Sequence, residues 1–283
     1  MDKNTIIGFV LIALVLIGFS WYNQPSAEQL EAQRKEDSIA AVIKDNTAKR
    51  QQAEAAARKA QAEAAAKGDS TSLFFSALNG QNQPVVLKND KVELTFSSKG
   101  GTISKAVIKG FENVDNSKNE VTLFDEKTQQ MNFLLAGKSE NIITQDLYFT
   151  PSNVTDSTVT MTAEAGNGGS LILSYSLGKN YLLHFSLQAN GLSGMFAPNY
   201  REVDVEWSDL ARQQEKGFTF ENRYSTLTYK ERNGGTDYLS ETSEKVNEKI
   251  DEALDWVAFK NQFFSAALIS KDDFQGGSLM TSI

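Results

Sequence analysis

The chain has few side chains of the kinds that perform catalysis, and its single histidine is the first to consider. His184 lies between Leu183 and Phe185 on the polar phase of an alternating segment, so we expect it to point away from the apolar face. A catalytic triad needs a histidine that a nucleophile and a carboxylate can reach, and the sequence places no such partners near His184. The chain has no cysteine, which removes thiol chemistry and cysteine-ligated metal sites. We therefore predict no catalytic residue, no metal site and no cofactor.

Three other patterns have a superficial likeness to ligand sites. The run Gly166-Asn167-Gly168-Gly169 lacks the lysine of a phosphate-binding loop and precedes a predicted strand, so we interpret it as a hairpin turn. The triplet Asp115-Asn116-Ser117 lacks the glycine and the bidentate glutamate that complete a calcium loop. Asp204 and Glu206 alternate with apolar residues and indicate a solvated strand face, whereas a glycosidase needs two acids that converge across a cleft. None of these patterns predicts an enzyme.

Alternating apolar residues dominate the chain after Thr71 and predict half-buried β-strands. Between Val159 and Leu187 they predict a three-stranded meander, with turns at 165–169 and 178–180. So many antiparallel strands without intervening helices imply two packed sheets or a large sandwich. The predicted strands cover residues 85–87, 92–96, 121–124, 133–135, 147–149, 159–163, 171–177, 181–187, 203–207, 218–220 and 227–229.

One stretch near the end of the chain departs from this alternation. Val246, Ile250, Leu254 and Val257 follow one another at spacings of four, four and three, which favours a helix over residues 242–260. The residues that follow, 263–264 and 266–269, are apolar and predict a buried strand.

The first residues of the chain form an uncharged apolar run, from Ile6 to Tyr22. At ~1.5 Å per residue, such a helix is near the minimum length that crosses a hydrocarbon core of about 30 Å. A cleaved secretory signal is the alternative, but the run ends in bulky aromatics without a small-residue cleavage triplet. Lys3 precedes the run and no further Lys or Arg follows until Arg34, which favours a cytoplasmic amino terminus. The predicted anchor residues include Ile6, Ile7, Phe9, Leu11, Leu14, Leu16, Phe19, Trp21 and Tyr22.

After this anchor (residues 1–25), residues 26–70 are rich in Ala, Glu, Gln, Lys and Arg and poor in large apolar side chains. This composition predicts a helical or partly disordered stalk that sets the distance from the membrane. A coiled coil, or an envelope-spanning scaffold like the TolA-type stalk proteins, is the alternative interpretation of the same residues.

Charge separates the stalk from the domain at residues 71–283. Residues 1–70 hold nine acids and nine bases, so the whole formal charge of −8 belongs to the domain. Such a surface is repelled by nucleic acid, which we exclude as a partner. Without cysteines, an exported domain of this kind must be held together by burial of apolar side chains alone.

Three blocks together resemble the YidC-type membrane protein insertases of the YidC/Oxa/Alb family, in the form found in Bacteroidetes-like bacteria. The blocks are the apolar anchor, residues 89–103 (NDKVELTFSSKGGTI) and residues 256–264 (WVAFKNQFF). In that family a first transmembrane helix precedes a periplasmic domain with an S-x-G-G-x-I turn and a late W-V/I-A-x-K-x-Q-F-F block. Gly100 and Gly101 are expected to adopt positive φ at the turn, and Trp256, Phe263 and Phe264 to lie in the core.

The resemblance implies a mainly β domain with the β-supersandwich of galactose-mutarotase-like proteins, and strands from Trp256 onward. It conflicts with the helical periodicity, and residues 242–255 stay open between helix and strand. It implies an inner-membrane insertase, without covalent catalysis, that inserts and folds integral membrane proteins alone or with the Sec translocon. The expected partners are the lipid bilayer, nascent inner-membrane proteins and Sec translocon components, with the stalk and the domain in the periplasm.

The five further transmembrane helices of that family are absent from residues 1–283, so we expect an N-terminal portion whose domain is truncated at its C-terminal end. A carbohydrate-binding or mutarotase-like exported domain is the alternative suggested by the implied fold. Mutarotases use histidines and a glutamate in a sheet cleft, and His184 alone cannot supply that set.

Overall fold

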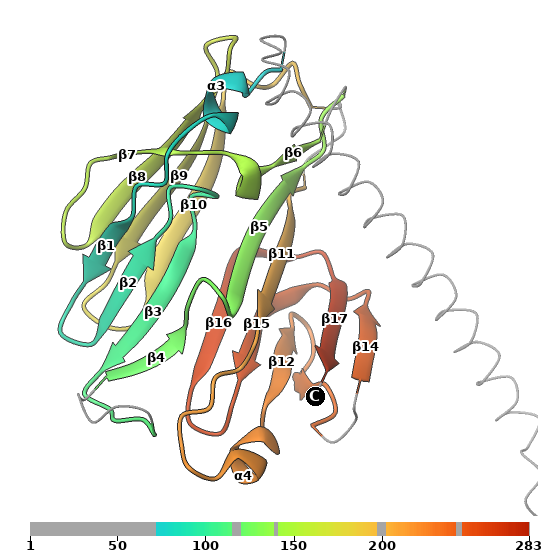
Figure 1. The fold of residues 1–283 in the computed structure, drawn as a ribbon. Coiled ribbons are helices and arrows are strands. Elements are labelled where there is room, and N and C mark those ends of the chain that lie inside the picture. Colours follow the sequence, from blue (N-terminus) through green and yellow to red (C-terminus); the bar gives the residue numbers. More distant parts are fainter. Residues whose placement is uncertain (1–71, 115–119, 139–140, 197–201, 242–244, 283) are drawn as a thin grey trace, which may run out of the picture. The chain divides into compact units, whose positions relative to one another are not determined.

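The computed structural model describes residues 72–282 apart from 115–119, 139–140, 197–201 and 242–244, and this part is almost entirely β-structure (Figure 1). The predicted anchor and stalk lie outside the described residues. Within the described part, no helix has the length and apolar character needed to cross a membrane. The described residues all fall within one compact unit of the chain.

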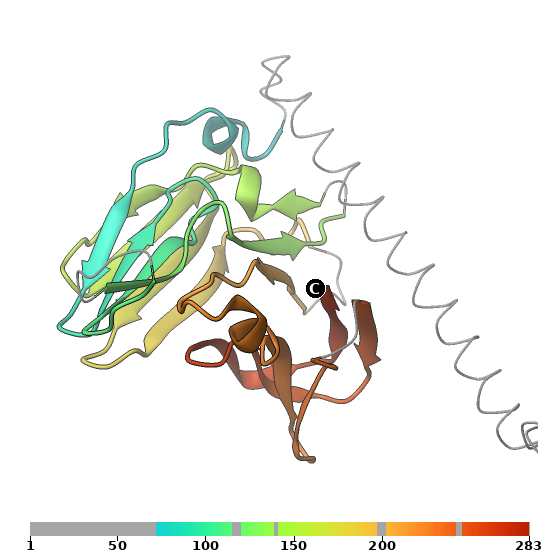
Figure 2. The ribbon, with the colours of Figure 1, turned by 60° about the horizontal axis from the view of Figure 1, so that its bottom comes forward.

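Two four-stranded antiparallel sheets enclose the larger hydrophobic core (Figures 1 and 2). One sheet has the order β1-β2-β3-β4 and the other has the order β10-β9-β8-β7. Their inner faces come from the predicted alternation: every second residue of β2, β8 and β9 is buried. The strands are β1 Val85–Lys88, β2 Val92–Phe96, β3 Ile103–Lys109, β4 Glu120–Phe124, β7 Thr150–Ser152, β8 Thr158–Glu164, β9 Ser170–Leu177 and β10 Leu183–Asn190.

A third sheet, ordered β11-β5-β6, connects this sandwich to the rest of the chain. β5 spans Gln129–Leu135, β6 spans Ile142–Ile143 and β11 spans Asp204–Asp209. Phe133 and Leu135 of β5 are buried in the larger core, and Val205 of β11 packs against it. Of two short helices, α3 (Phe75–Leu78) precedes β1, and the 3-10 helix η1 (Thr144–Asp146) lies between β6 and β7.

The last part of the described chain forms two further sheets around a smaller core of its own. One sheet has the order β13-β12-β15-β16, and the other pairs β14 with β17. Leu227, Leu254 and Leu279 are among the buried residues of this core. The elements are α4 Phe218–Asn222, β12 Thr226–Glu231, β13 Thr236–Tyr238, β14 Lys245–Ile250, β15 Leu254–Lys260, β16 Ser265–Phe274 and β17 Gly277–Ser282.

The predicted three-stranded meander is confirmed, since β9 pairs in antiparallel register with both β8 and β10. The Gly166-Asn167-Gly168-Gly169 run is the hairpin turn expected of it, with the Ala165 N–H donating to the Gly169 carbonyl at 2.8 Å. A mainly β fold built from several antiparallel sheets is therefore confirmed.

The helix that periodicity favoured over residues 242–260 is wrong for the described residues 245–260. Residues 245–250 form β14 and residues 254–260 form β15. The spacing of four between Val246 and Ile250 also places both on one face of a strand, because four is a multiple of two, whereas Leu254 begins the next strand in another sheet. Ile250 and Leu254 are both buried in the smaller core, and Val246 packs against it.

Three smaller strand predictions also need correction. Residues 218–220 begin α4 instead of a strand, because three alternating residues are too few to specify a strand and Phe220 is 55% exposed. Residues 147–149 form no named strand, and Tyr148 makes only an isolated bridge to Lys99. The buried strand predicted over 263–264 and 266–269 is present only in part: residues 266–269 lie in β16, where Leu268 is buried but Ile269, on the opposite face, is 59% exposed.

Candidate functional site

Gly100 and Gly101 form the tight turn between β2 and β3, as predicted from the glycine pair. Their φ angles are +83° and +69°, values that glycine adopts without steric cost. A Cβ on Gly101 would lie 2.8 Å from Leu173 Cδ1 and 3.0 Å from Phe149 Cδ2, so the turn packs closely against the larger core. The buried Tyr175 hydroxyl donates to the Gly101 carbonyl at 2.8 Å, and burial raises the pKa of that hydroxyl.

The predicted core block at residues 256–264 is only partly buried. Trp256 lies in β15 opposite Lys230 and Ile269 and is half-buried. Phe264 is half-buried and packs against the larger core. Phe263 is 48% exposed, so the expectation that it anchors the core is wrong. Phe263 and Phe264 lie in the turn between β15 and β16, where successive side chains point in different directions.

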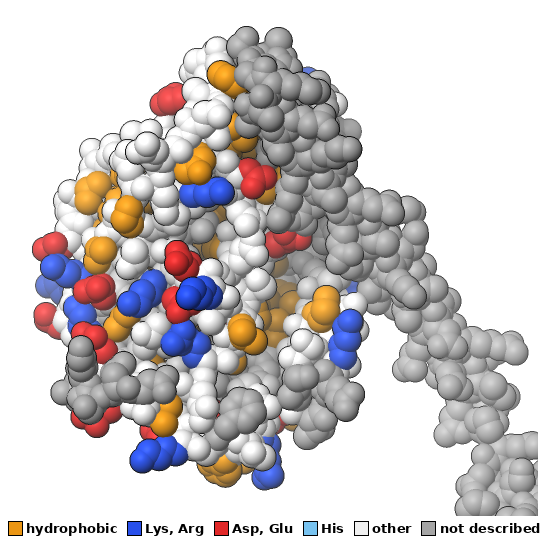
Figure 3. Space-filling model, in the orientation of Figure 1, with side chains coloured by type: hydrophobic (Ala, Val, Ile, Leu, Met, Phe, Trp, Pro, Cys, Tyr) orange, Lys and Arg blue, Asp and Glu red, His pale blue; other side chains and the backbone are white. Residues whose placement is uncertain are grey.

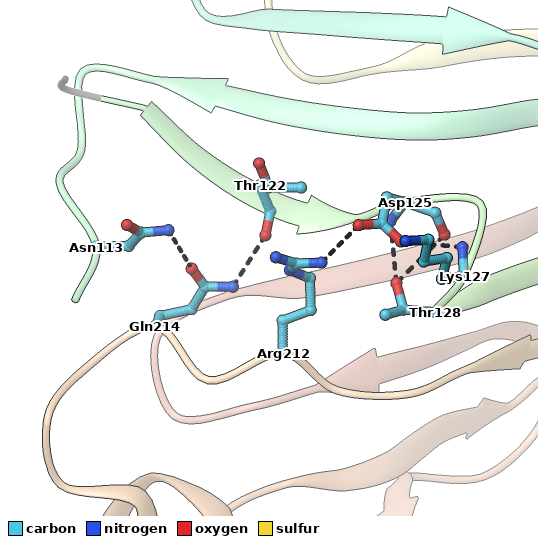
Figure 4. Close-up of polar contacts among 7 residues, drawn as sticks. All are labelled: Asn113, Thr122, Asp125, Lys127, Thr128, Arg212 and Gln214. Atoms are coloured by element: carbon cyan, nitrogen blue, oxygen red, sulfur yellow. Dashed lines mark hydrogen bonds and ion pairs between the residues drawn. The ribbon is translucent and has the colours of Figure 1, made fainter. Parts of the chain in front are cut away.

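The segment between β11 and α4, residues 210–217, connects three parts of the domain and forms the centre of the candidate site (Figure 4). Gln214 is 2% exposed, and its side-chain amide donates to the Thr122 carbonyl of β4 at 3.1 Å. Its backbone carbonyl accepts the Val114 N–H at 2.7 Å. Arg212 forms an ion pair with Asp125 at 2.6 Å, just beyond the end of β4. These contacts tie the segment to the first sheet.

The buried carboxylate of Glu221 holds the other end of this segment. Its Oε2 atom accepts the backbone N–H groups of Gln214 and Glu215 at 2.9 and 3.0 Å. Its Oε1 atom accepts the Gln214 N–H at 3.0 Å and the Asn261 side-chain amide at 3.4 Å. Because Asn261 starts the β15–β16 turn, one carboxylate joins α4, the 210–217 segment and that turn.

Exposed aromatic side chains surround this polar junction. Phe220 and Tyr224 pack edge to face at 5.8 Å between ring centroids, and Phe111 packs edge to face against Phe264 at 5.7 Å. Phe111, Phe220 and Phe263 are 48%, 55% and 48% exposed. In Figure 3, hydrophobic and Lys or Arg side chains lie next to one another at the lower end of the molecule, where Figure 1 places α4. Exposed apolar groups on neighbouring segments are typical of interaction surfaces.

Trp207 and Asp209 extend the junction along β11. The Trp207 ring packs against Phe259 of β15 at 4.5 Å between centroids. In the amide orientation that satisfies both of its polar groups, Gln129 accepts from the Trp207 indole N–H at 3.1 Å and donates to the Ile103 carbonyl at 2.9 Å. The Oδ1 atom of Asp209 is buried and has no hydrogen-bond partner among the described residues. Burial raises the pKa of Asp209 from 3.8 to about 6.

Replacing Asp209 with asparagine is expected to stabilise the domain at neutral and alkaline pH. Because folding favours the protonated carboxyl, its stabilising contribution is present below pH 3.8 and is lost as the pH rises through about 6. At pH 8 we expect the free energy of unfolding of Asp209→Asn to exceed that of the natural chain by about 1 kcal/mol, after allowance for partial solvent screening. Urea denaturation from pH 4 to pH 8 checks this, and a pH-independent difference would contradict it.

The structure does not bring the candidate catalytic residues together. His184 is exposed on β10, as its polar phase predicted. Asp204 and Glu206 lie on β11, where Glu206 is exposed. No group of acids and histidines among the described residues could hold a metal ion. Gln214 and Glu221 were not predicted, because no local pattern marks them and, apart from their contact with each other, their partners such as Thr122 and Asn261 lie far away in the sequence.

Comparison with known proteins identifies relatives along the whole chain. A family model described as the YidC periplasmic domain matches residues 84–281. A membrane protein insertase YidC from Phocaeicola vulgatus is 45% identical over all of this chain and 45% of its own length. Proteins of the same name from Bacteroides fragilis and Porphyromonas gingivalis are 43% and 35% identical, over 97% and 99% of this chain. The chain spans less than half the length of these relatives.

Proposed function

We propose that this chain, which belongs to the YidC family of membrane protein insertases, forms the anchored N-terminal portion of an insertase. The observation that carries this proposal is the similarity to a membrane protein insertase YidC from end to end, including residues 1–70. The family identity inferred from the S-x-G-G-x-I turn and the Trp256 block is confirmed by these relatives. Their names favour insertion over a carbohydrate-active domain or a stalk scaffold.

In this proposal the chain has three parts with different tasks. Residues 1–25 cross the inner membrane, residues 26–70 form a stalk, and residues 71–283 form a periplasmic domain. The several antiparallel sheets and two hydrophobic cores support a β-supersandwich for that domain. The parent protein inserts and folds integral inner-membrane proteins, alone or with the Sec translocon, through binding instead of covalent catalysis. The bilayer, nascent membrane proteins and Sec components are its partners.

Membrane extraction and protease accessibility test this arrangement in cells that express the chain. We expect the chain to remain in the membrane after alkaline carbonate extraction, because an apolar span of this length is costly to remove from lipid. We expect added protease to digest the domain in spheroplasts but not in intact cells. A variant that lacks residues 1–25 is the control and should be extracted. Release of the intact chain by carbonate, or digestion only after cell lysis, would contradict the proposal.

A further inference from the structure

Strand β10 forms a long sheet edge that lacks the features by which edge strands usually avoid pairing with another chain. It lies at the end of the order β10-β9-β8-β7 and pairs with β9 over all eight of its residues without a register shift (Figure 2). No described residue outside β9 pairs with its backbone. Its sequence, LHFSLQAN, contains no Lys, Arg, Asp, Glu or Pro. Alternate residues of such an edge direct N–H and C=O groups away from the sheet, where they can pair with another chain.

The other edge strands of the described sheets are protected by familiar means. β1, β6, β7 and β13 have only two to four residues, and β7 contains Pro151. β4 and β16 pair through irregular registers, while β11 and β14 carry charged residues. β17 is uncharged, but it is shorter than β10, begins with a glycine and contacts β12. β10 therefore differs from every other edge in combining length, regular pairing and absence of charge.

The inward face of β10 also leaves apolar surface uncovered. The Phe185 ring stacks on Tyr175 and lies near Phe133, at 6.0 Å between centroids in both pairs. Phe185 nevertheless remains 37% exposed. Leu183 and Leu187, on the same face, are only partly buried although they pack against the larger core. A further strand beside β10 would cover this face with its own inward side chains.

We propose that the free edge of β10 binds an extended polypeptide segment, which adds to the sheet as a fifth strand. Backbone pairing supplies the affinity, and the Leu183, Phe185 and Leu187 face selects segments that alternate apolar and polar residues. Because the edge carries no Lys, Arg, Asp or Glu side chain, recognition does not depend on charged residues in the segment. That such a segment belongs to a membrane protein undergoing insertion rests on the proposed function, whereas the binding chemistry does not.

A second copy of the chain fits this edge less well. Stable interfaces between folded proteins use roughly 20–30 residues on each side. An edge of eight residues supplies far fewer, so two copies paired through β10 alone would bury too little surface for a stable dimer. An extended segment uses most of its backbone hydrogen-bonding groups along the strand and needs no further surface.

Binding of matched peptides to the detergent-solubilised chain tests the proposal. The probe is a fluorescent peptide that alternates valine and serine over the length of β10, flanked by lysines for solubility. Its twin carries N-methyl groups on alternate residues, which remove backbone donors and leave charge and side chains unchanged. We expect the twin to bind at least about tenfold more weakly, because several backbone hydrogen bonds are lost.

Two variants test whether the peptide binds at β10. Ser186→Lys, on the exposed polar phase of β10, should weaken binding of the unmethylated peptide, because lysine disfavours pairing at an edge. Val154→Lys, at a residue that is 53% exposed between β7 and β8, is the matched control and should leave binding unchanged. Equal affinity for both peptides, or equal loss in both variants, would overturn the proposal. Sedimentation is also compared for the natural chain and Ser186→Lys. A dimer that Ser186→Lys abolishes would overturn the proposal and would show that a second copy of the chain binds at β10.

Discussion

Alanine at Gly101 is expected to lower the free energy of unfolding by about 2–4 kcal/mol, because it combines backbone strain with overpacking. The residue has a φ of +69°, and its new Cβ would lie 2.8 Å from Leu173 and 3.0 Å from Phe149. Neither neighbour can withdraw easily, since Leu173 and Phe149 are both buried in the larger core. Urea denaturation of the detergent-solubilised chain, followed by tryptophan fluorescence, measures the change.

Gly168→Ala separates the two causes. Gly168 has a comparable φ of +80°, but a Cβ there meets no atom within 4 Å. We expect this control to lose only the strain contribution, about 1 kcal/mol. Similar losses in the two variants would mean that close contact with the core does not explain the glycine at position 101.

Alanine at Glu221 is expected to cost about 2–4 kcal/mol and to loosen the junction between β11 and α4. The substitution removes the acceptor for the Gln214 and Glu215 N–H groups and for the Asn261 amide. Buried donors without an acceptor carry their full desolvation cost, and hydrogen bonds to a charged group are stronger than average. Hydrogen exchange should show faster exchange of the Gln214 amide, together with the fall in unfolding free energy.

The neighbouring residue provides the control for this prediction. The Glu215 side chain is exposed, so Glu215→Ala removes a carboxylate of the same type but leaves the Glu221 network intact. We expect a change within about 0.5 kcal/mol for this variant. If Glu221→Ala is as stable as Glu215→Ala, the buried carboxylate does not hold the junction together.

Alternation in the sequence predicted the strands of the larger sandwich well. Every second residue of β8 and β9 is buried, so the apolar residues mark the inner face of each strand. The helical period near the end of the chain was misleading, because the spacing of four between Val246 and Ile250 fits helix and strand alike and Leu254 belongs to a separate strand. Pairing of β14 with β17 and of β15 with β12 decides the outcome, and these partners lie far from them in the chain.

The candidate site could be predicted only where the residue type itself indicates a backbone conformation, as glycine does. The glycine pair indicated a tight turn, and both residues have positive φ. Phe263 and Phe264 look alike in the sequence, yet only Phe264 packs against the core, since turn geometry decides which ring is covered. Gln214 and Glu221 are ordinary polar residues in sequence, and only folding brings them to β4 and the β15–β16 turn.

Depletion of the parent protein in its own cells tests membrane insertion most directly. The gene is placed under a repressible promoter, and insertion of a newly made, pulse-labelled inner-membrane protein is followed by protease accessibility of its exported segment. We expect insertion to fall on depletion and to recover when the intact gene is restored, while export of a soluble periplasmic protein changes less. Unchanged insertion of inner-membrane proteins after depletion would contradict the assignment of this chain to a functioning insertase.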